Sequence, residues 1–265
     1  MPVRLETEGP VALITLDRPE ALNALDLASL RALRGHLATV RDRDDLRVAI
    51  LTGAGERAFC AGADLKQAAS ASYAQAFTQG DESAADLGLY IRLMDLAALQ
   101  LHKPVIAAVN GHCLGGGLEL ALQCPLRIAS ERASFGLPEV AVGSIPAVSG
   151  LHRLLQAVPS AHAMQMVLSA DRIDAAHAAR IGLVSEVTEP GALLDRAFAL
   201  ARRIAGHAPL AVQAVNRLAR QTRHLGEADA QALTELHWGV LRDTADRNEG
   251  RTAFAAKRAP HYLGR

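Results

Sequence analysis

The chain has 265 residues, half of them hydrophobic, which is enough to bury the core of one large domain or of a domain with an appendage. Lysine plus arginine and aspartate plus glutamate number 28 each, and aromatic residues make up only 3%, so the composition argues against nucleic acid and an anionic membrane as partners. Three cysteines, an odd number, predict reduced thiols in a cytoplasmic protein. We expect neither a signal peptide nor a membrane span, because no apolar run is suitable for either.

The N-terminal part of the chain predicts strands that alternate with helices. An apolar run over residues 11–16 predicts a strand, and a β-branched run over residues 47–52 predicts a buried one. Between them, Asp26 can cap a helix. The apolar stripe of this helix consists of Leu27, Leu30, Leu33, Leu37 and Val40. Residues 53–66 form a loop of small residues, and the weakly periodic residues 67–86 are expected to be the most mobile segment.

A helix is expected over residues 87–101, and a strand, a run of glycines and a second helix follow it. Residues 105–109 are apolar and β-branched, as in a buried strand. Three consecutive glycines at 115–117 are costly inside a regular element, so we place them at the junction with the helix. Such a helix presents free N–H groups and the positive end of its dipole, and Glu119 lies close to its start. The alternative interpretation is a tight turn beside a solvated glutamate.

The rest of the sequence becomes mostly helical. Its expected elements are short strands at 126–129, 133–136 and 184–187, a loop at 143–150, and helices over most of the chain beyond 151. The change of pattern near residues 189–191 predicts a boundary between a core, residues 1–190, and a helical region, residues 191–265.

Two glutamates, Glu119 and Glu139, are the strongest candidates for acid–base chemistry. Each follows a segment that contains glycine, and each is flanked by apolar residues. Two carboxyl groups in one apolar pocket resist ionisation, and each changes the pKa of the other. Their pKa values then differ, so one can act as an acid and the other as a base. The alternative is two surface carboxylates at the ends of elements.

The backbone amides of Ala63 and Gly116 are candidates for an oxyanion hole, which holds a carbonyl oxygen as it gains negative charge. Both lie in small-residue loops that follow strands, and two such loops suggest backbone segments that meet at one ligand site. This pattern is common in α/β proteins.

Other chemistries have weaker support. His112 and Cys113 are adjacent in the sequence, but neighbours rarely face each other on a strand, so we interpret Cys60 and Cys113 as packed thiols. Ser149 is not in a nucleophile elbow, and the glycines 115–117 do not match the dinucleotide-binding pattern. No spacing of histidine, cysteine and acidic residues indicates a metal site.

Several motifs together resemble those of the enoyl-CoA hydratase/isomerase (crotonase) superfamily, most closely its enoyl-CoA hydratases. The likeness runs from about residue 3 to residue 265. The motifs are Arg18-Pro19-Glu20-Ala21-Leu22-Asn23-Ala24-Leu25, Ala58-Phe59-Cys60-Ala61-Gly62-Ala63-Asp64-Leu65-Lys66, Asn110-Gly111-His112-Cys113-Leu114-Gly115-Gly116-Gly117-Leu118-Glu119-Leu120, Phe135-Gly136-Leu137-Pro138-Glu139-Val140, and Phe254-Ala255-Ala256-Lys257-Arg258-Ala259-Pro260 with Gly264-Arg265.

The resemblance implies an α/β fold, a spiral of ββα units over residues 1–190 with the acyl-CoA site, and a C-terminal helical trimerisation region over residues 191–265. It implies an acyl-CoA substrate, homotrimers or hexamers built as dimers of trimers, and no metal or redox cofactor, with coenzyme A as part of the substrate. Ala63 and Gly116 match the oxyanion-hole positions, and Glu119 and Glu139 match the two catalytic acids of hydratases. The implied substrate-binding positions are Ala24, Ala61, Asp64, Leu65, Gly115 and Ala147.

The segment 146–151 departs from the family pattern, which is richer in glycine and ends in Gly-Gly-Thr. The Ala147 amide can still help to hold a water molecule, whereas Val148 and Leu151 would change the acyl pocket. The resemblance implies an enoyl-CoA hydratase that adds water in syn fashion to a 2-enoyl-CoA, giving a 3-hydroxyacyl-CoA. The alternatives are a Δ3,Δ2-enoyl-CoA isomerase or a dehydratase of a substituted acyl-CoA and, from another class, a CoA- or RNA-binding protein with secondary catalysis.

Overall fold

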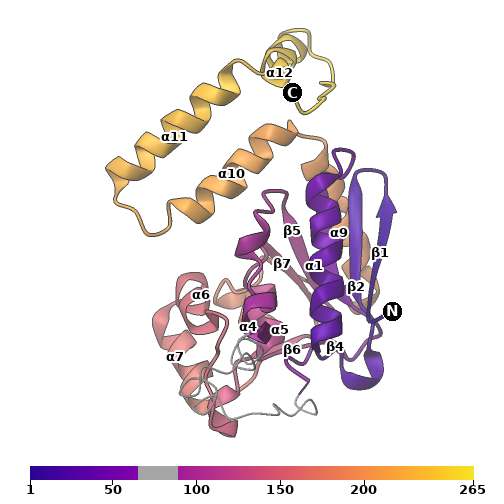
Figure 1. The fold of residues 1–265 in the computed structure, drawn as a ribbon, viewed down its shortest axis with the longest axis vertical. Helices are drawn as coiled ribbons and strands as arrows, with labels where there is room; N and C mark the ends of the chain where they lie inside the picture. Colours follow the sequence, from indigo (N-terminus) through magenta and orange to yellow (C-terminus); the bar gives the residue numbers. More distant parts are fainter. Residues whose placement is uncertain (65–88) are drawn as a thin grey trace, which may run out of the picture.

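The computed structural model describes residues 1–64 and 89–265, and its centre is a six-stranded sheet (Figure 1). The strand order is β1-β2-β3-β5-β7-β10. The antiparallel pair β1–β2 forms one edge, and the other pairings are parallel. The strands are β1 (Val3–Glu8), β2 (Val11–Leu16), β3 (Val48–Gly53), β5 (Val105–Val109), β7 (Leu126–Ser130) and β10 (Glu186–Thr188).

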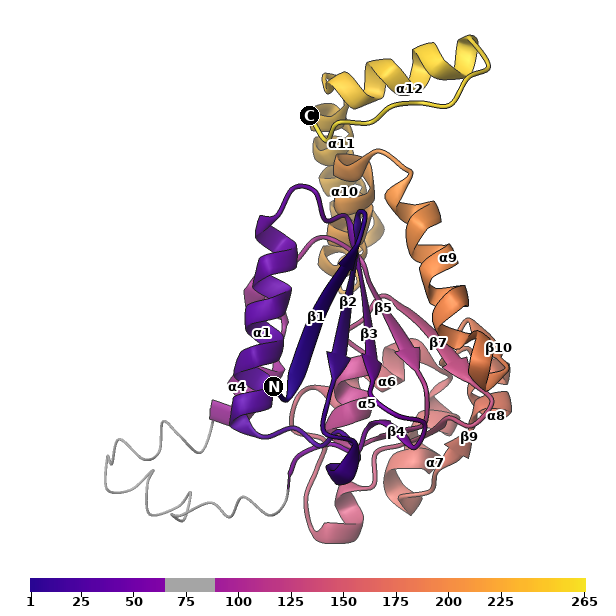
Figure 2. The ribbon, with the colours of Figure 1, turned by 90° about the vertical axis from the view of Figure 1, so that its right-hand side faces the viewer.

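Helices cover both faces of this sheet, because its central strands are apolar on both sides (Figure 2). One face packs against α1 (Leu27–Asp42), which begins where the Asp26 side chain accepts a hydrogen bond from the Ser29 amide at 2.7 Å. The other face packs against α9 (Leu193–Ala205), whose small buried residues allow close approach to the strands.

A second, smaller sheet lies beyond the carboxyl ends of the large one. Its order is β4-β6-β8-β9, with bounds Ala58–Cys60, His112–Leu114, Ser134–Gly136 and Ile173–Asp174. Three times the chain passes from a strand of the large sheet directly into one of the small sheet, from β3 to β4, β5 to β6 and β7 to β8. The loops that follow β4 and β6 are therefore delivered side by side.

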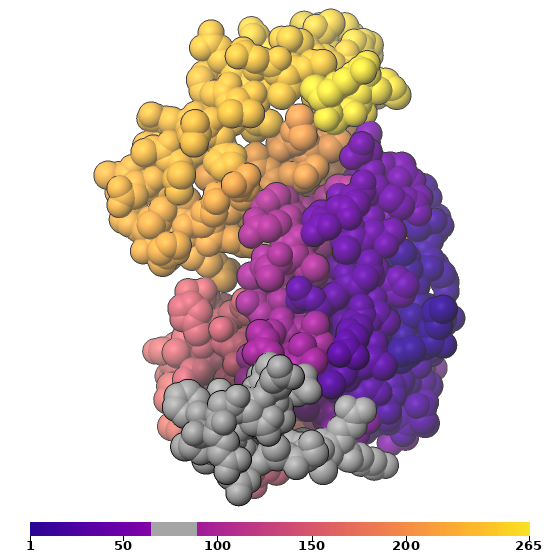
Figure 3. Space-filling view, viewed as in Figure 1, coloured from indigo at the N-terminus to yellow at the C-terminus, as the bar shows by residue number. Residues whose placement is uncertain are grey.

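Short helices surround the small sheet, and longer ones form a lobe at the C-terminal end (Figures 1 and 3). The first group is α4 (Leu89–Met94), α5 (Gly116–Ala121), α6 (Gly150–Ala157), α7 (Ser160–Ser169) and α8 (Ala175–Arg180). The lobe consists of α10 (Pro209–Gln221), α11 (Glu227–Arg242) and α12 (Ala245–Ala255). Within residues 1–64 and 89–265, none of the helices has the length and apolarity that a membrane crossing requires.

The observed elements differ from the expected ones where pairing partners decide the structure. β1 was not expected, and β4 and β6 are strands inside segments that were interpreted as loops. The expected helix over residues 87–101 is the short α4 followed by a 3₁₀ turn, Ala97–Leu99. The expected strand over residues 184–187 is β10, two residues further on. The segment that was predicted to be mobile, residues 67–86, lies outside the described residues.

Candidate active site

The two small-residue loops touch each other at the carboxyl ends of β4 and β6. These strands are parallel, and Cys60 pairs with Cys113 in the register. A Cβ atom at Gly117 would lie 2.1 Å from the main-chain oxygen of Cys60, and one at Gly62 would lie 3.1 Å from the amide nitrogen of Gly116. The backbones therefore approach to a distance that only glycine permits at position 117.

The side chain of Asn110 forms hydrogen bonds with the backbone of the segment that precedes the first loop. Asn110 donates from Nδ2 to the main-chain oxygens of Gly53, Gly55 and Ala58 at 3.0, 2.8 and 3.2 Å, and its Oδ1 accepts from the Gly53 amide at 3.2 Å. Asn23 donates to the oxygen of Ala58 as well, at 2.7 Å. The positions of the two loops thus depend on side-chain hydrogen bonds in addition to strand pairing.

The amides of Ala63 and Gly116 are available to a ligand. Ala63 is exposed and forms an isolated parallel bridge with Leu25, while Gly116 is the first residue of α5, where helical N–H groups have no partner within the helix. No hydrogen bond between described residues uses either amide as donor. Because Gly62, next to Ala63, adjoins the Gly116 nitrogen, the structure brings the two predicted oxyanion residues together.

The Glu119 carboxyl group is buried and held by backbone amides. The residue is 3% exposed, and its Oε1 accepts hydrogen bonds from the amides of Val148 at 2.7 Å and Gly150 at 3.0 Å. Burial raises the pKa of Glu119, while the two amide contacts and the charge of Arg153 oppose that rise. The carboxyl group is therefore fixed in orientation, and its raised pKa makes it a stronger base than a solvent-exposed glutamate.

Glu139 lies at the start of a 3₁₀ helix, Glu139–Val142, opposite the loop that holds Gly116. A Cβ atom at Gly115 would lie 3.2 Å from its Oε1, and its buried Oε2 has no hydrogen-bond partner among the described residues. Burial raises the pKa of Glu139, and the nearby charge of Glu119 raises it further. The two glutamates predicted from sequence thus share one site with the two amides.

Tyr90, on α4, is a further residue of the site that sequence reasoning missed. A Cβ atom at Gly116 would lie 3.1 Å from its hydroxyl oxygen, which is buried and has no hydrogen-bond partner among the described residues. Burial raises the pKa of Tyr90, and Cys60, Glu119 and Glu139 contribute to the rise. The hydroxyl group is therefore a neutral donor beside both glutamates. Tyr90 is a single tyrosine in a short helix and belongs to no recognisable motif, so the sequence does not predict that it lies at the site.

Comparison with known proteins assigns the chain to a family. The profile of the family Enoyl-CoA hydratase/isomerase matches residues 6–265. The chain belongs to this family. The family prediction is therefore confirmed, as is the prediction that the chain is an enzyme.

The relatives cover the whole chain. (E)-benzylidenesuccinyl-CoA hydratase of Thauera aromatica is 46% identical, with 100% of both chains covered. Carnitinyl-CoA dehydratase of Salmonella arizonae is 41% identical, covering 99% of this chain and 98% of its own. The crystal structure of an enoyl-CoA hydratase from Bacillus anthracis is 34% identical, covers 100% of both chains and has a TM-score of 0.92. The predicted crotonase-like α/β fold with C-terminal helices is confirmed.

The positions that the family resemblance assigned to substrate binding are mostly near the loops. Asp64 forms an ion pair with Arg18 at 2.9 Å, and Arg18 also donates to the main-chain oxygen of Ala24 at 2.9 Å. The amide of Ala61 donates to Leu22 at 3.0 Å. These contacts place Ala24, Ala61 and Asp64 in one neighbourhood. Gly115 adjoins Glu139, as described above, and Leu65 lies outside the described residues.

Ala147, predicted to hold a water molecule, lies at the edge of the site. It is exposed, and the amides that contact Glu119 belong to the next residues in the chain, Val148 and Gly150. No sequence motif indicates these two contacts, because they join residues separated by about thirty positions. The role of Ala147 stays a prediction.

The cysteines are fully buried thiols. Burial raises the pKa of Cys60 and of Cys124 to about 12, and it raises that of Cys113 as well. A thiol with a raised pKa is a poor nucleophile at neutral pH. The interpretation of these residues as packed side chains therefore agrees with their surroundings.

Proposed function

We propose that this enzyme adds water to the double bond of a 2-enoyl-CoA thioester, giving a 3-hydroxyacyl-CoA by syn addition. The observation that carries this proposal is the placement of two carboxyl groups with raised pKa values, one buried and one half-buried, beside two free backbone amides. One donor in an oxyanion hole contributes about 3–4 kcal/mol to a transition state.

In the proposed mechanism, the thioester oxygen accepts hydrogen bonds from the amides of Ala63 and Gly116 as the acyl group becomes enolate-like. Glu119 takes a proton from water while the water oxygen forms its bond to Cβ. Glu139 supplies a proton to Cα, and the enolate collapses to the saturated thioester. Glu119 then releases its proton and Glu139 regains one through solvent, so the net change is one water molecule added across the double bond, with no electrons gained or lost. The contacts of Glu119 with two amides suit it to orient one water molecule.

The test follows loss of enoyl absorbance with crotonyl-CoA and longer 2-enoyl-CoA thioesters. Glu119→Gln and Glu139→Gln should each lower kcat by about 100-fold or more, which is a typical acid–base contribution. Glu131→Gln, at an exposed position, is the matched control and should retain wild-type turnover. Absence of turnover with every ester would defeat the proposal.

A second candidate is a dehydratase or a Δ3,Δ2-enoyl-CoA isomerase that acts on a substituted acyl-CoA. Two observations favour it. One relative is named carnitinyl-CoA dehydratase, and Val148 in the altered segment 146–151 is 3% exposed and donates its amide to Glu119. A panel of 3-enoyl and 3-hydroxyacyl thioesters, assayed beside plain 2-enoyl esters, separates the candidates by the best substrate.

We also propose that the C-terminal lobe assembles the chain into a homotrimer, alone or paired as a hexamer, in the cytoplasm. Large apolar side chains are exposed on α11 and α12, among them Leu236, Trp238, Val240 and Phe254. Such side chains mark association surfaces when they gather on one lobe. Sedimentation of the purified protein, with a Trp238→Glu variant for comparison, would measure the state.

A further inference from the structure

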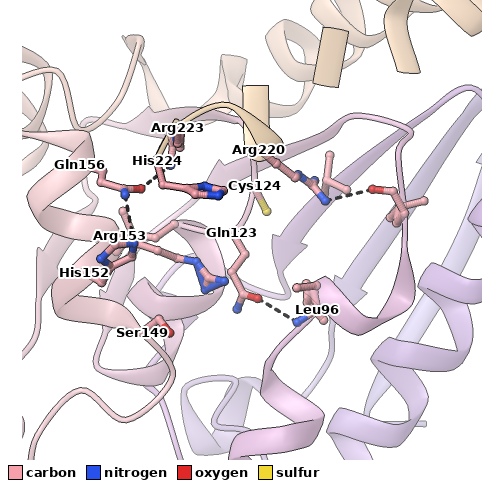
Figure 4. A pocket seen from close by; sticks show the side chains of 14 residues that line it. Leu96, Gln123, Cys124, Ser149, His152, Arg153, Gln156, Arg220, Arg223 and His224 are labelled. Carbon is pink, nitrogen blue, oxygen red and sulfur yellow. Dashed lines mark hydrogen bonds between the residues drawn. The ribbon is translucent and has the colours of Figure 1, made fainter. Parts of the chain in front are cut away.

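A cavity of about 390 Å³ lies between the end of α5, α6 and the end of α10 (Figure 4). Two of its lining residues adjoin Glu119 itself. Ser149 stands between the two residues whose amides bind the carboxylate, and Gln123 donates from Nε2 to the main-chain oxygen of Glu119 at 3.3 Å. Residues of the cavity lining therefore adjoin Glu119 and the segment that holds its carboxyl group.

The arginine and histidine side chains that line this cavity come from two segments of the chain. Figure 4 shows His152 and Arg153 from α6 on one side, and Arg220, Arg223 and His224 from the end of α10 and the turn after it. The fourteen described lining residues include no aspartate and no glutamate. The cavity brings together cations from two segments about seventy residues apart, in a chain whose overall charge is balanced.

These cations are weakly compensated. Arg153 forms an ion pair with Asp95 at 3.6 Å, and the charge of Glu119 also acts on it, but neither carboxylate belongs to the lining. Arg220 donates to the main-chain oxygen of Leu101 at 3.1 Å, and Arg223 donates to the neutral Gln156 side chain at 3.0 Å.

The three guanidinium groups also repel one another. Burial lowers the pKa of both Arg153 and Arg220, and Arg223 lowers both further. Arginine nevertheless stays charged at neutral pH, so an anion in this cavity would relieve the mutual repulsion of the three groups.

We propose that this cavity binds a carboxylate carried by the acyl group, so that the substrate is an acyl-CoA thioester with a second, free carboxyl group. The inference rests on the proposed function, because it takes the thioester carbonyl to lie at Gly116 and the reacting carbons to lie between the two glutamates. Acyl atoms beyond Cβ then continue past Glu119. Leu96, Ala97 and Leu101 provide apolar walls for the carbons, and the arginines can bind the carboxylate.

The experiment compares pairs of 2-enoyl-CoA thioesters of equal chain length, one ending in a carboxylate and the other in a methyl group. Wild-type kcat/KM should favour the carboxylate ester at one or more lengths by about tenfold or more, as expected for a charge-assisted hydrogen bond. Arg220→Gln and Arg223→Gln should abolish that preference and leave kcat/KM for the methyl esters within about twofold. Arg217→Gln, on the same helix but outside the cavity lining, is the matched control.

Two results would overturn the inference. One is a preference for the methyl ester at every length. The other is an equal loss with both esters in the arginine variants, which would assign the cations to a coenzyme A phosphate or to folding. Titration of the saturated carboxylate and methyl acyl-CoA thioesters by calorimetry needs no turnover. It therefore distinguishes failure of this inference from failure of the hydratase proposal, since tighter binding of the carboxylate form is expected in either case.

Discussion

Gly150 is the position at which a single methyl group would disturb Glu119. A Cβ atom at Gly150 would lie 2.7 Å from Oε1 and 2.8 Å from Cγ of Glu119, and 2.9 Å from Cβ of Pro146. Carbon atoms pack at about 3.5–4.0 Å, so the Glu119 side chain would have to move by about 0.7 Å or more in Gly150→Ala. The movement would also stretch one of the two amide contacts that hold the carboxylate.

We expect Gly150→Ala to lower kcat by about tenfold to 100-fold, since a misplacement of about 1 Å at a reacting group costs up to that factor. KM should change little, because the substitution leaves the amides of Ala63 and Gly116 in place. Initial rates of enoyl absorbance loss over a range of ester concentrations measure both constants.

Two controls make this prediction sharp. Gly35→Ala, on the exposed side of α1 where an added Cβ meets nothing within 4 Å, should keep wild-type turnover. In a Glu119→Gln background, Gly150→Ala should cause little further loss, because the group that it displaces no longer acts as a base. Wild-type kcat in Gly150→Ala, or full additivity of the two substitutions, would refute the reasoning.

Three other predictions follow from the geometry of the site. Gly117→Ala should destabilise the fold by about 1–3 kcal/mol in a denaturant titration, because the new methyl group would overlap the backbone oxygen of Cys60, and a wild-type midpoint would contradict this. Tyr90→Phe should lower kcat by about tenfold if its hydroxyl group donates to the substrate, as a neutral hydrogen bond would, whereas unchanged kinetics would make Tyr90 a packing residue only. Glu139→Gln should gain stability relative to wild type as pH rises. The raised pKa of Glu139 means that its favourable contribution is complete below its ordinary pKa and is lost as pH rises through the folded value. Thermal melts at several pH values measure this difference, and a constant difference would contradict it.

Local signals in the sequence located the elements that depend on few distant contacts. The α1 helix was expected from a capping aspartate and a stripe of apolar residues. In the structure the aspartate caps the helix, and most of the apolar stripe is buried. The buried strand β3 was expected from its β-branched run. The three-residue strands β4 and β6 were missed, because segments so short are stabilised by their pairing with each other and carry no period of their own.

The residues of the candidate site also differ in how well the sequence predicts them. Glu119, Glu139 and the glycines belong to contiguous motifs, so they could be predicted as candidates from the sequence. The amide contacts of Val148 and Gly150, the hydroxyl group of Tyr90 and the basic cavity each join segments that are distant in the chain. No pattern in one sequence reports which distant segments meet, and these features therefore appeared only with the fold.

The close approach of the two loops has a consequence for protein engineering. At Gly111 and Gly117 an added Cβ would lie 2.4 and 2.1 Å from backbone atoms, which cannot be exchanged by mutation. Most variants in a library that randomises these positions would therefore be destabilised. Selection for new acyl groups is better directed at side chains such as His152 and His224, which line the cavity without holding the loops together.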